Sequence, residues 1–291
     1  MLKLERVEPF GVLEDWERIY EEVKPGTIFM HPRWSVLSAE YSGGEPIFWA
    51  IIHEKPVGYI SASYYPVRET LVVPVFDPIF APYSDFVILP KYRTQGIRFF
   101  LESIRGSYKK ILVGPIREDS PTVSAISGMG KIISSVSIKY AKLKGDPMEH
   151  LYRLKSYEFI KMFDSLERKL NVRVEINGFE NLDNVINGSY KLSPHRELAL
   201  KSILSGYREK VKIIGIWEGN KSLGYTVLVE GDGKLFALLN TVPEEKILLG
   251  IWKYIYDRGL RDITLEVPIP TFTYDKELGF KVLKANVYEI T

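Results

Sequence analysis

The sequence has 291 residues, of which 45% are hydrophobic and 26% are charged. This composition is that of a folded chain with room for two domains, and it excludes a largely disordered protein. A formal net charge of +2 excludes a strongly basic nucleic-acid-binding chain, and the lack of cysteine excludes disulfides, thiolate nucleophiles and Cys-ligated zinc.

Hydrophobic spacing predicts the elements of the first half. In chain order they are two helices, a strand hairpin, two strands, a helix, a strand, a short helix and a strand, at residues 12–23, 31–42, 46–53 with 57–65, 70–76, 85–89, 93–106, 109–114, 120–127 and 131–143.

The second half follows a polar segment with Gly and Pro, residues 144–150, which we interpret as a linker. We therefore expect domains at residues 1–148 and 149–291. The predicted elements are a helix, a strand, two helices, three strands, a helix, a strand, a short helix and a last strand, at residues 156–170, 172–176, 182–190, 194–206, 211–217, 222–230, 234–240, 244–259, 262–267, 273–278 and 280–290.

Local similarities between the halves occur in the same order. EKPVGYIS at residues 54–61 matches NKSLGYTV at 220–227, and GMGKIISS at 128–135 matches ELGFKVLK at 277–284. Repeated matches in one order indicate that the chain contains a duplicated unit.

Residues 90–98 read PKYRTQGIR and include the only glutamine of the chain, Gln95. They lie between a predicted strand and a predicted helix. The first N–H groups of a helix lack partners within it and, with the helix dipole, favour an anion. Gly96 would let a phosphate approach the backbone, and Arg93 and Arg98 would add charged hydrogen bonds. The stretch predicts a phosphate site, and its alternative is an ordinary helix start with solvated arginines.

The stretch resembles the acyl-CoA loop of the GCN5-related N-acetyltransferases (GNAT), as does the order of elements around it. That family places Gln or Arg, two residues, Gly, one residue and then Gly or Ala at the start of a helix. The resemblance implies an α+β fold of two tandem GNAT-like domains, each a mostly antiparallel twisted sheet flanked by helices. It also implies that the pyrophosphate of acetyl-CoA or another acyl-CoA binds at Arg93, Thr94, Gln95, Gly96, Ile97 and Arg98. Arg98 departs from the pattern, because the family has a small residue there.

Three residues are candidates for the chemistry. TYDKELGFKVL at residues 273–283 resembles the end of a GNAT domain, which implies that Tyr274 protonates the departing thiolate; the alternative is a packed aromatic ring. Asp85 and Glu266 lie at strand ends, where burial can raise the pKa of a carboxyl group into the range of a general base. The alternative for Glu266 is a carboxylate that faces water. The loop at residues 240–246 has two acids and no glycine, so we expect no CoA in the second half.

Phe29, Pro32 and Trp34 form a Phe-x-x-Pro-x-Trp pattern that is similar to the Fem-type aminoacyl transferases and the CelD/BioF2-like acyltransferases. The resemblance implies an N-acyltransferase that uses acyl-CoA and an amine acceptor, a small molecule or a peptide, between the domains. One alternative is a Fem-type transferase with an aminoacyl-tRNA donor, but the sequence lacks the long helical arm typical of those enzymes. The other is a degenerate tandem domain that binds a ligand without catalysis.

No apolar stretch has the length of a membrane span or of a signal-peptide core, so we expect a cytoplasmic protein that does not contact membranes. The scarcity of Gln and Cys, with abundant Lys, Glu, Ile and Tyr, is typical of a heat-adapted source. The four histidines have no metal-ligand spacing, so we expect no metal: His31, His53, His150 and His195.

Overall fold

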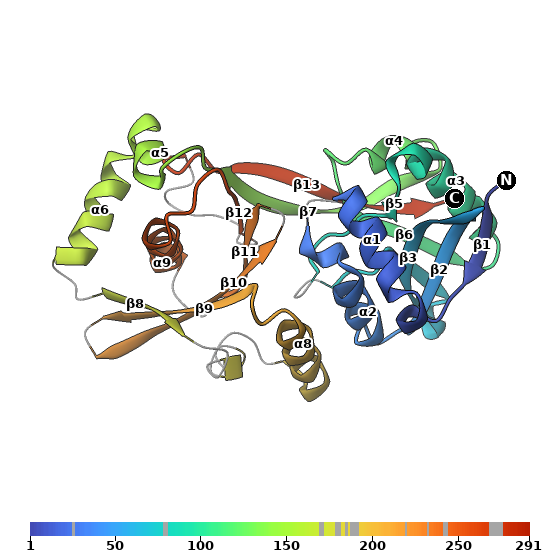
Figure 1. Cartoon of the computed structure of the whole chain (residues 1–291), viewed down its shortest axis with the longest axis horizontal. Helices are drawn as coiled ribbons and strands as arrows, with labels where there is room; N and C mark the ends of the chain where they lie inside the picture. The colour runs from blue at the N-terminus through green and yellow to red at the C-terminus, as the bar shows by residue number, and fades with distance from the viewer. Residues whose placement is uncertain are drawn as a thin grey trace. The chain divides into compact units, whose positions relative to one another are not determined.

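A computed structural model describes residues 1–24, 27–77, 81–168, 172–177, 182–183, 186, 192–218, 220–231, 233–240, 244–267 and 276–291. Its contacts define two compact units, unit 1 being Met1–Val136 with Lys284–Thr291 and unit 2 being Ser137–Leu283 (Figure 1). In the described ranges, no helix is long and apolar enough to cross a membrane. The domain boundary at 148/149 stays a prediction.

Unit 1 is built on a sheet with strand order β1-β2-β3-β4-β6-β13-β7, and β5 pairs with β3. Its first strands are antiparallel, while β4 and β6 run parallel. The elements are β1 (Lys3–Arg6), α1 (Leu13–Val23), α2 (Pro32–Glu40), β2 (Glu45–His53), β3 (Lys55–Tyr65), β4 (Thr70–Val73), β5 (Val87–Ile88), α3 (Arg93–Ile104), β6 (Lys110–Arg117), α4 (Thr122–Ile126), the start of β7 (Gly130–Lys142) and most of β13 (Lys281–Ile290).

Helices cover both faces of this sheet because successive strand residues point to opposite sides. On β2, Trp49 and Ile51 pack into the cluster that contains α3 and α4. Phe48 and Ala50 pack instead into the cluster that contains α1 and α2. Unit 1 therefore has three layers, with α3 and its predicted anion loop on one face and α1 on the other.

Unit 2 has a sheet with strand order β7-β12-β11-β10-β9-β8, in which β11 and β12 run parallel and the other neighbouring strands run antiparallel. Its core cluster joins these strands to α5, α6 and α9, and Figure 1 shows α8 and α9 on opposite sides of β9 and β10. Its described elements are α5 (Pro147–Arg153), α6 (Tyr157–Arg168), β8 (Val172–Asn177), α8 (Pro194–Gly206), β9 (Val211–Glu218), β10 (Lys221–Gly231), β11 (Lys234–Asn240), α9 (Glu244–Asp257) and β12 (Thr264–Val267).

Two strands, β7 and β13, each have residues in both units. β13, the last strand of the chain, pairs with β6 in unit 1, from Ala285 opposite Arg117 to Ile290 opposite Ile111. The end of β7 pairs with β12 in unit 2, with Tyr140 opposite Glu266. The order of elements along the chain does not reveal these pairings, because either strand could complete either sheet.

The predicted fold class is confirmed, since each unit is a largely antiparallel sheet flanked by helices. The linker prediction is wrong, because α5 begins inside residues 144–150 with the Asp146 carboxylate accepting from the N–H groups of Met148 and Glu149. The predicted strand at 70–76 ends at Val73. The first half of the predicted helix at 273–278 lies outside the described residues, and residues 276–278 form a turn.

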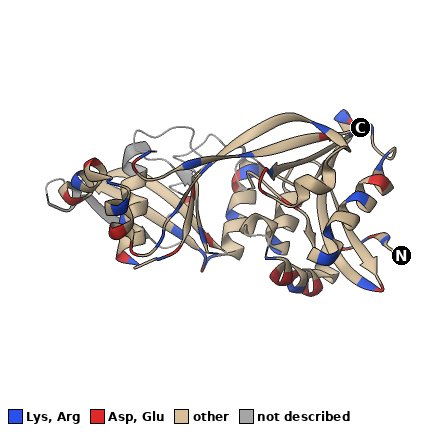
Figure 2. Ribbon diagram, turned by 90° about the horizontal axis from the view of Figure 1, so that it is seen from above, with Lys and Arg blue, Asp and Glu red and all other residues tan. Residues whose placement is uncertain are grey.

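Charges of both signs are interspersed along the chain (Figure 2). This distribution agrees with the net charge of +2, and blue and red segments both occur in the ribbon of each unit.

Candidate functional site

The predicted anion loop begins α3 in unit 1. A single turn of 3-10 helix, Pro90–Tyr92, precedes α3. The N–H of Tyr92 donates to the carbonyl of Leu89 at 2.8 Å, and the N–H of Arg93 donates to the carbonyl of Pro90. Backbone groups just before α3 are therefore used within the turn, so an anion would have to bind at the N–H groups of the next residues.

Gly96 faces the sheet. A Cβ atom at this position would lie 3.3 Å from Cγ2 of Ile88 and 3.5 Å from Cδ1 of Ile51. Ile97 is fully buried in the adjacent core. The glycine is thus explained by the close approach of α3 to the strands beneath it, and the space it leaves is taken by isoleucine side chains.

Thr94, Gln95 and Arg98 are the exposed members of the loop, and Arg93 is partly buried. Nε of Arg98 donates to the carbonyl of Ala125 at 3.1 Å, which ties α3 to α4. Nε of Arg93 is buried and has no hydrogen-bond partner among the described residues. Arg98, where the family has a small residue, therefore has a structural role, because its side chain links α3 to α4.

Asp85 is the centre of a partly buried hydrogen-bond network at the start of α4. Its carboxylate accepts from the hydroxyls of Ser120 and Thr122 and, at 2.7 Å, from the N–H of Phe86. Burial raises the pKa of Asp85 above its usual range, although these hydrogen bonds and the charge of Arg93 act in the opposite direction. Both carboxylate oxygens already hold the start of α4 in place.

The segment containing Asp85 also covers the edge of β6. β4 pairs with β6 only up to Val73, opposite Val113. Beyond that point the N–H of Ser84 donates to the carbonyl of Pro115 at 2.9 Å. Residues 81–86 thus return to lie beside β6 where β4 has left it.

The aromatic pattern near the N-terminus belongs to the core of unit 1. Phe29 is 3% exposed and Trp34 is fully buried, with ring centroids 5.5 Å apart. Phe29 also makes an edge contact with Tyr83 at 5.4 Å. These rings hold residues 81–86 against α2, which is a packing role.

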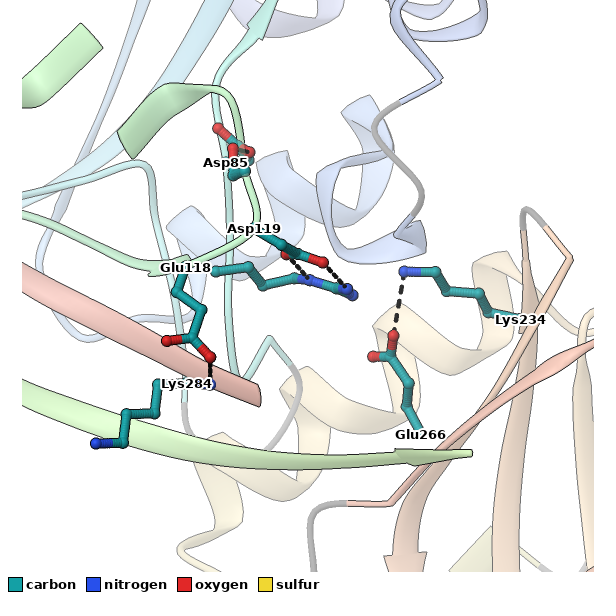
Figure 3. Close-up of polar contacts among 8 residues, drawn as sticks. Asp85, Glu118, Asp119, Lys234, Glu266 and Lys284 are labelled. Carbon is teal, nitrogen blue, oxygen red and sulfur yellow. Dashed lines mark hydrogen bonds and ion pairs between the residues drawn. The ribbon is translucent and has the colours of Figure 1, made fainter. Parts of the chain in front are cut away.

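Glu266 lies in unit 2, on β12. Its side chain is 3% exposed, and its carboxylate lies 3.1 Å from Nζ of Lys234 on the parallel neighbour β11 (Figure 3). The alternative of a carboxylate facing water is therefore wrong. Tyr274 lies outside the described residues, as do residues 241–243 of the glycine-free loop.

Sequence reasoning missed the partners of both acids. A buried carboxylate in an apolar strand needs a counter-charge, but Lys234 is 32 positions away and is located only by the pairing of β11 with β12. Ser120 and Thr122 stand in an ordinary turn sequence. Within the described ranges, no group of three or more metal-ligating side chains is found.

Solved structures share this architecture over nearly the whole chain, although the sequence matches no protein-family model and no curated protein. The crystal structure of FemX superposes with a TM-score of 0.66 at 10% identity, covering 99% of this chain and 97% of that one. A tandem GNAT protein from the clavulanic acid biosynthesis pathway gives 0.57 at 10% identity, covering 99% and 98%. The chain has the tandem GNAT fold. L-PGS from Bacillus licheniformis also matches this chain, with a TM-score of 0.57 at 11% identity and coverage of 95% and 90%.

Proposed function

We propose that this tandem GNAT chain is an N-acyltransferase that moves an acyl group from acyl-CoA to an amine. The observation that carries the proposal is the first turn of α3, where Thr94 and Gln95 are exposed beside the exposed Lys91. The positive end of a helix with a nearby ammonium favours the pyrophosphate of CoA. Gly96 contributes by letting α3 lie close to the sheet.

The reaction requires two proton movements. A neutral amine attacks the thioester carbonyl, the C–S bond breaks, the amine nitrogen loses a proton and the thiolate gains one. Asp85 is a candidate base because the pKa of its carboxyl is raised by burial. Glu266 is the other candidate base, held by Lys234, and Tyr274 is the candidate acid.

Asp85 and Glu266 differ in how freely they could take a proton. Asp85 would have to release one of the hydroxyls that it holds, so it fits the role of a positioning residue for α4 as well as that of a base. Glu266 is instead held by an ion pair with Lys234 on the neighbouring strand. We propose both carboxylates as candidates for the base, and a variant at Lys234 tests the role of Glu266.

The second candidate function is that of a Fem-type transferase with an aminoacyl-tRNA donor, and one specific observation favours it. The fold match to FemX at a TM-score of 0.66 agrees with the Phe-x-x-Pro-x-Trp pattern, which is similar to the Fem-type aminoacyl transferases as well as to the CelD/BioF2-like acyltransferases. We place it second because the net charge of +2 and interspersed charges provide little attraction for a polyanion.

Release of the CoA thiol from acetyl-CoA, followed with a thiol reagent, tests acyl transfer. The protein has no cysteine, so it contributes no thiol of its own. We expect thiol release that depends on an added amine from a panel of amino acids, polyamines and peptides. Lys234→Met, which removes the ammonium beside Glu266, should lower the turnover number by at least ~10-fold. Saturable CoA binding without thiol release for any amine would favour the non-catalytic alternative.

A further inference from the structure

A pocket of about 600 Å³ lies in unit 1 on the α1 face of the sheet. It is formed where the start of α1 passes the turn between β2 and β3, and its volume is in the range of small-molecule sites. Its lining residues are Phe10, Gly11, Val12, Leu13, Glu14, Asp15, Arg18, Lys55, Pro56 and Tyr59.

One wall of the pocket is a preorganised hydrogen-bond network. Oδ1 of Asp15 accepts from Nε and Nη2 of Arg18 at 3.0 and 2.7 Å, and Oδ2 accepts from the hydroxyl of Tyr59 at 2.8 Å. Burial, and then the hydrogen bond to Asp15, raise the pKa of Tyr59, so the phenol remains a donor. Oδ2 holds a single donor in these contacts and has the capacity for a second one.

Two opposite charges on the pocket are not neutralised within the protein. Glu14 and Lys55 are both exposed lining residues. Over the described part of the chain, neither forms an ion pair within 4.0 Å, with each other or with a third residue. A ligand with both a positive and a negative group can satisfy the two charges at once.

The rim of the pocket is apolar. Phe10 is 73% exposed, which is unusual for a large hydrophobic side chain, and it lines the pocket together with Pro56. An apolar ligand body could cover this ring and remove apolar surface from water.

We propose that this pocket binds a small zwitterion with an apolar body, the chemical class of a free amino acid. The ammonium of the ligand binds Glu14 and the free capacity of Asp15 Oδ2, and its carboxylate binds Lys55. The side chain of the ligand packs on Phe10 and Pro56. The site does not depend on the proposed acyl transfer, because none of its lining residues belongs to the predicted CoA loop at residues 93–98.

The first test is a calorimetric titration of the full-length protein with L-phenylalanine. Two analogues of the same size class each lack one charge: phenethylamine has no carboxylate and 3-phenylpropanoate has no amine. We expect L-phenylalanine to bind with a dissociation constant on the order of 0.1–1 mM and each analogue to bind about tenfold more weakly. Equal affinity for all three compounds, or no saturable binding of L-phenylalanine at 20 mM (roughly 20 times the upper constant), overturns the proposal.

Two charge-removing variants show which residue binds the carboxylate of the ligand and which binds its ammonium. Lys55→Gln should weaken L-phenylalanine about tenfold and leave phenethylamine unchanged, because that analogue has no carboxylate to lose. Glu14→Gln should weaken L-phenylalanine and leave 3-phenylpropanoate unchanged. Glu21→Gln and Lys3→Gln, at exposed positions that do not line the pocket, are the matched controls. Controls that weaken L-phenylalanine as much as Glu14→Gln and Lys55→Gln also overturn the proposal.

Discussion

Replacing Asp85 with alanine should destabilise unit 1. The change removes the acceptor of three donors, the hydroxyls of Ser120 and Thr122 and the N–H of Phe86. A buried donor without an acceptor costs about 1–3 kcal/mol, although a hydroxyl can rotate to another acceptor. Burial of the carboxylate, which raises the pKa of Asp85, is itself unfavourable and offsets part of the loss. We expect a net loss of about 2–4 kcal/mol in the free energy of unfolding.

The assay is urea unfolding read by hydrogen exchange of peptides from α3 and β6, so that unit 1 is measured separately. With an m-value of about 2 kcal/mol/M, the midpoint should fall by about 1–2 M. Asp119→Ala is the control, because Asp119 is 54% exposed and pairs with Arg117 at 2.9 Å at the surface. That change should cost less than about 1 kcal/mol. Equal midpoints for the two variants would refute the buried network.

The pH dependence has a definite sign. Since the pKa of Asp85 is raised in the folded state, folded protein binds this proton more tightly than unfolded protein. The contribution is fully present below the ordinary value of 3.8 and is lost as pH rises through the raised value. Relative to Asp85→Asn, which does not titrate, the wild-type protein should therefore lose stability as pH rises from about 4. If the free energy of unfolding of the wild-type protein instead rises with pH relative to that of Asp85→Asn, the pKa of Asp85 is lowered on folding and the reasoning is wrong.

Three further predictions concern stability. Gly250→Ala should lower the free energy of unfolding of unit 2 by about 1–3 kcal/mol in urea, because its Cβ would lie 2.5 Å from Cδ1 of Ile216; a stabilised variant would show that this contact relaxes. Lys234→Met should cost about 3 kcal/mol by the same assay, since Glu266 is 3% exposed, whereas Lys253→Met at a surface pair should cost under about 1 kcal/mol. Tyr59, with a pKa raised by burial and by Asp15, contributes stability that is present below pH 10 and declines above it. The rise in absorbance at about 295 nm near pH 10 should therefore be the same in the wild-type protein and in Tyr59→Phe, because Tyr59 does not ionise there. A larger rise in the wild-type protein would contradict the burial of Tyr59.

Much of the fold could be predicted because it is encoded locally. Helical spacing in residues 12–23 and alternation in residues 46–53 survive as α1 and β2 almost unchanged. The pairing of β7 with β12 and of β13 with β6 could not be predicted, because strand pairing between distant segments leaves no local pattern. The start of α5 was missed because its Asp146-Pro147 cap also reads as a turn.

The sequence correctly places residues 93–98 at the start of a helix, but it does not reveal the surroundings of each candidate residue. Gly96 was assigned to a phosphate, yet its missing side chain is explained by Ile88 and Ile51, which only the packed structure reveals. Glu266 was singled out because a carboxylate in an apolar strand needs a partner, and Lys234 provides one. The identity of that partner depends on which strands are neighbours.

The most direct test of the proposed acyl-CoA site is a calorimetric titration with CoA of the wild-type protein, Gln95→Glu and Ser103→Glu. An acid in the first turn of α3 suits the helix dipole but repels a pyrophosphate, whereas the same charge at the exposed Ser103 in the last turns does not reach it. We predict saturable binding that Gln95→Glu weakens by at least ~10-fold and Ser103→Glu leaves intact. Binding that is absent from the folded wild-type protein, or unchanged in Gln95→Glu, would contradict the site.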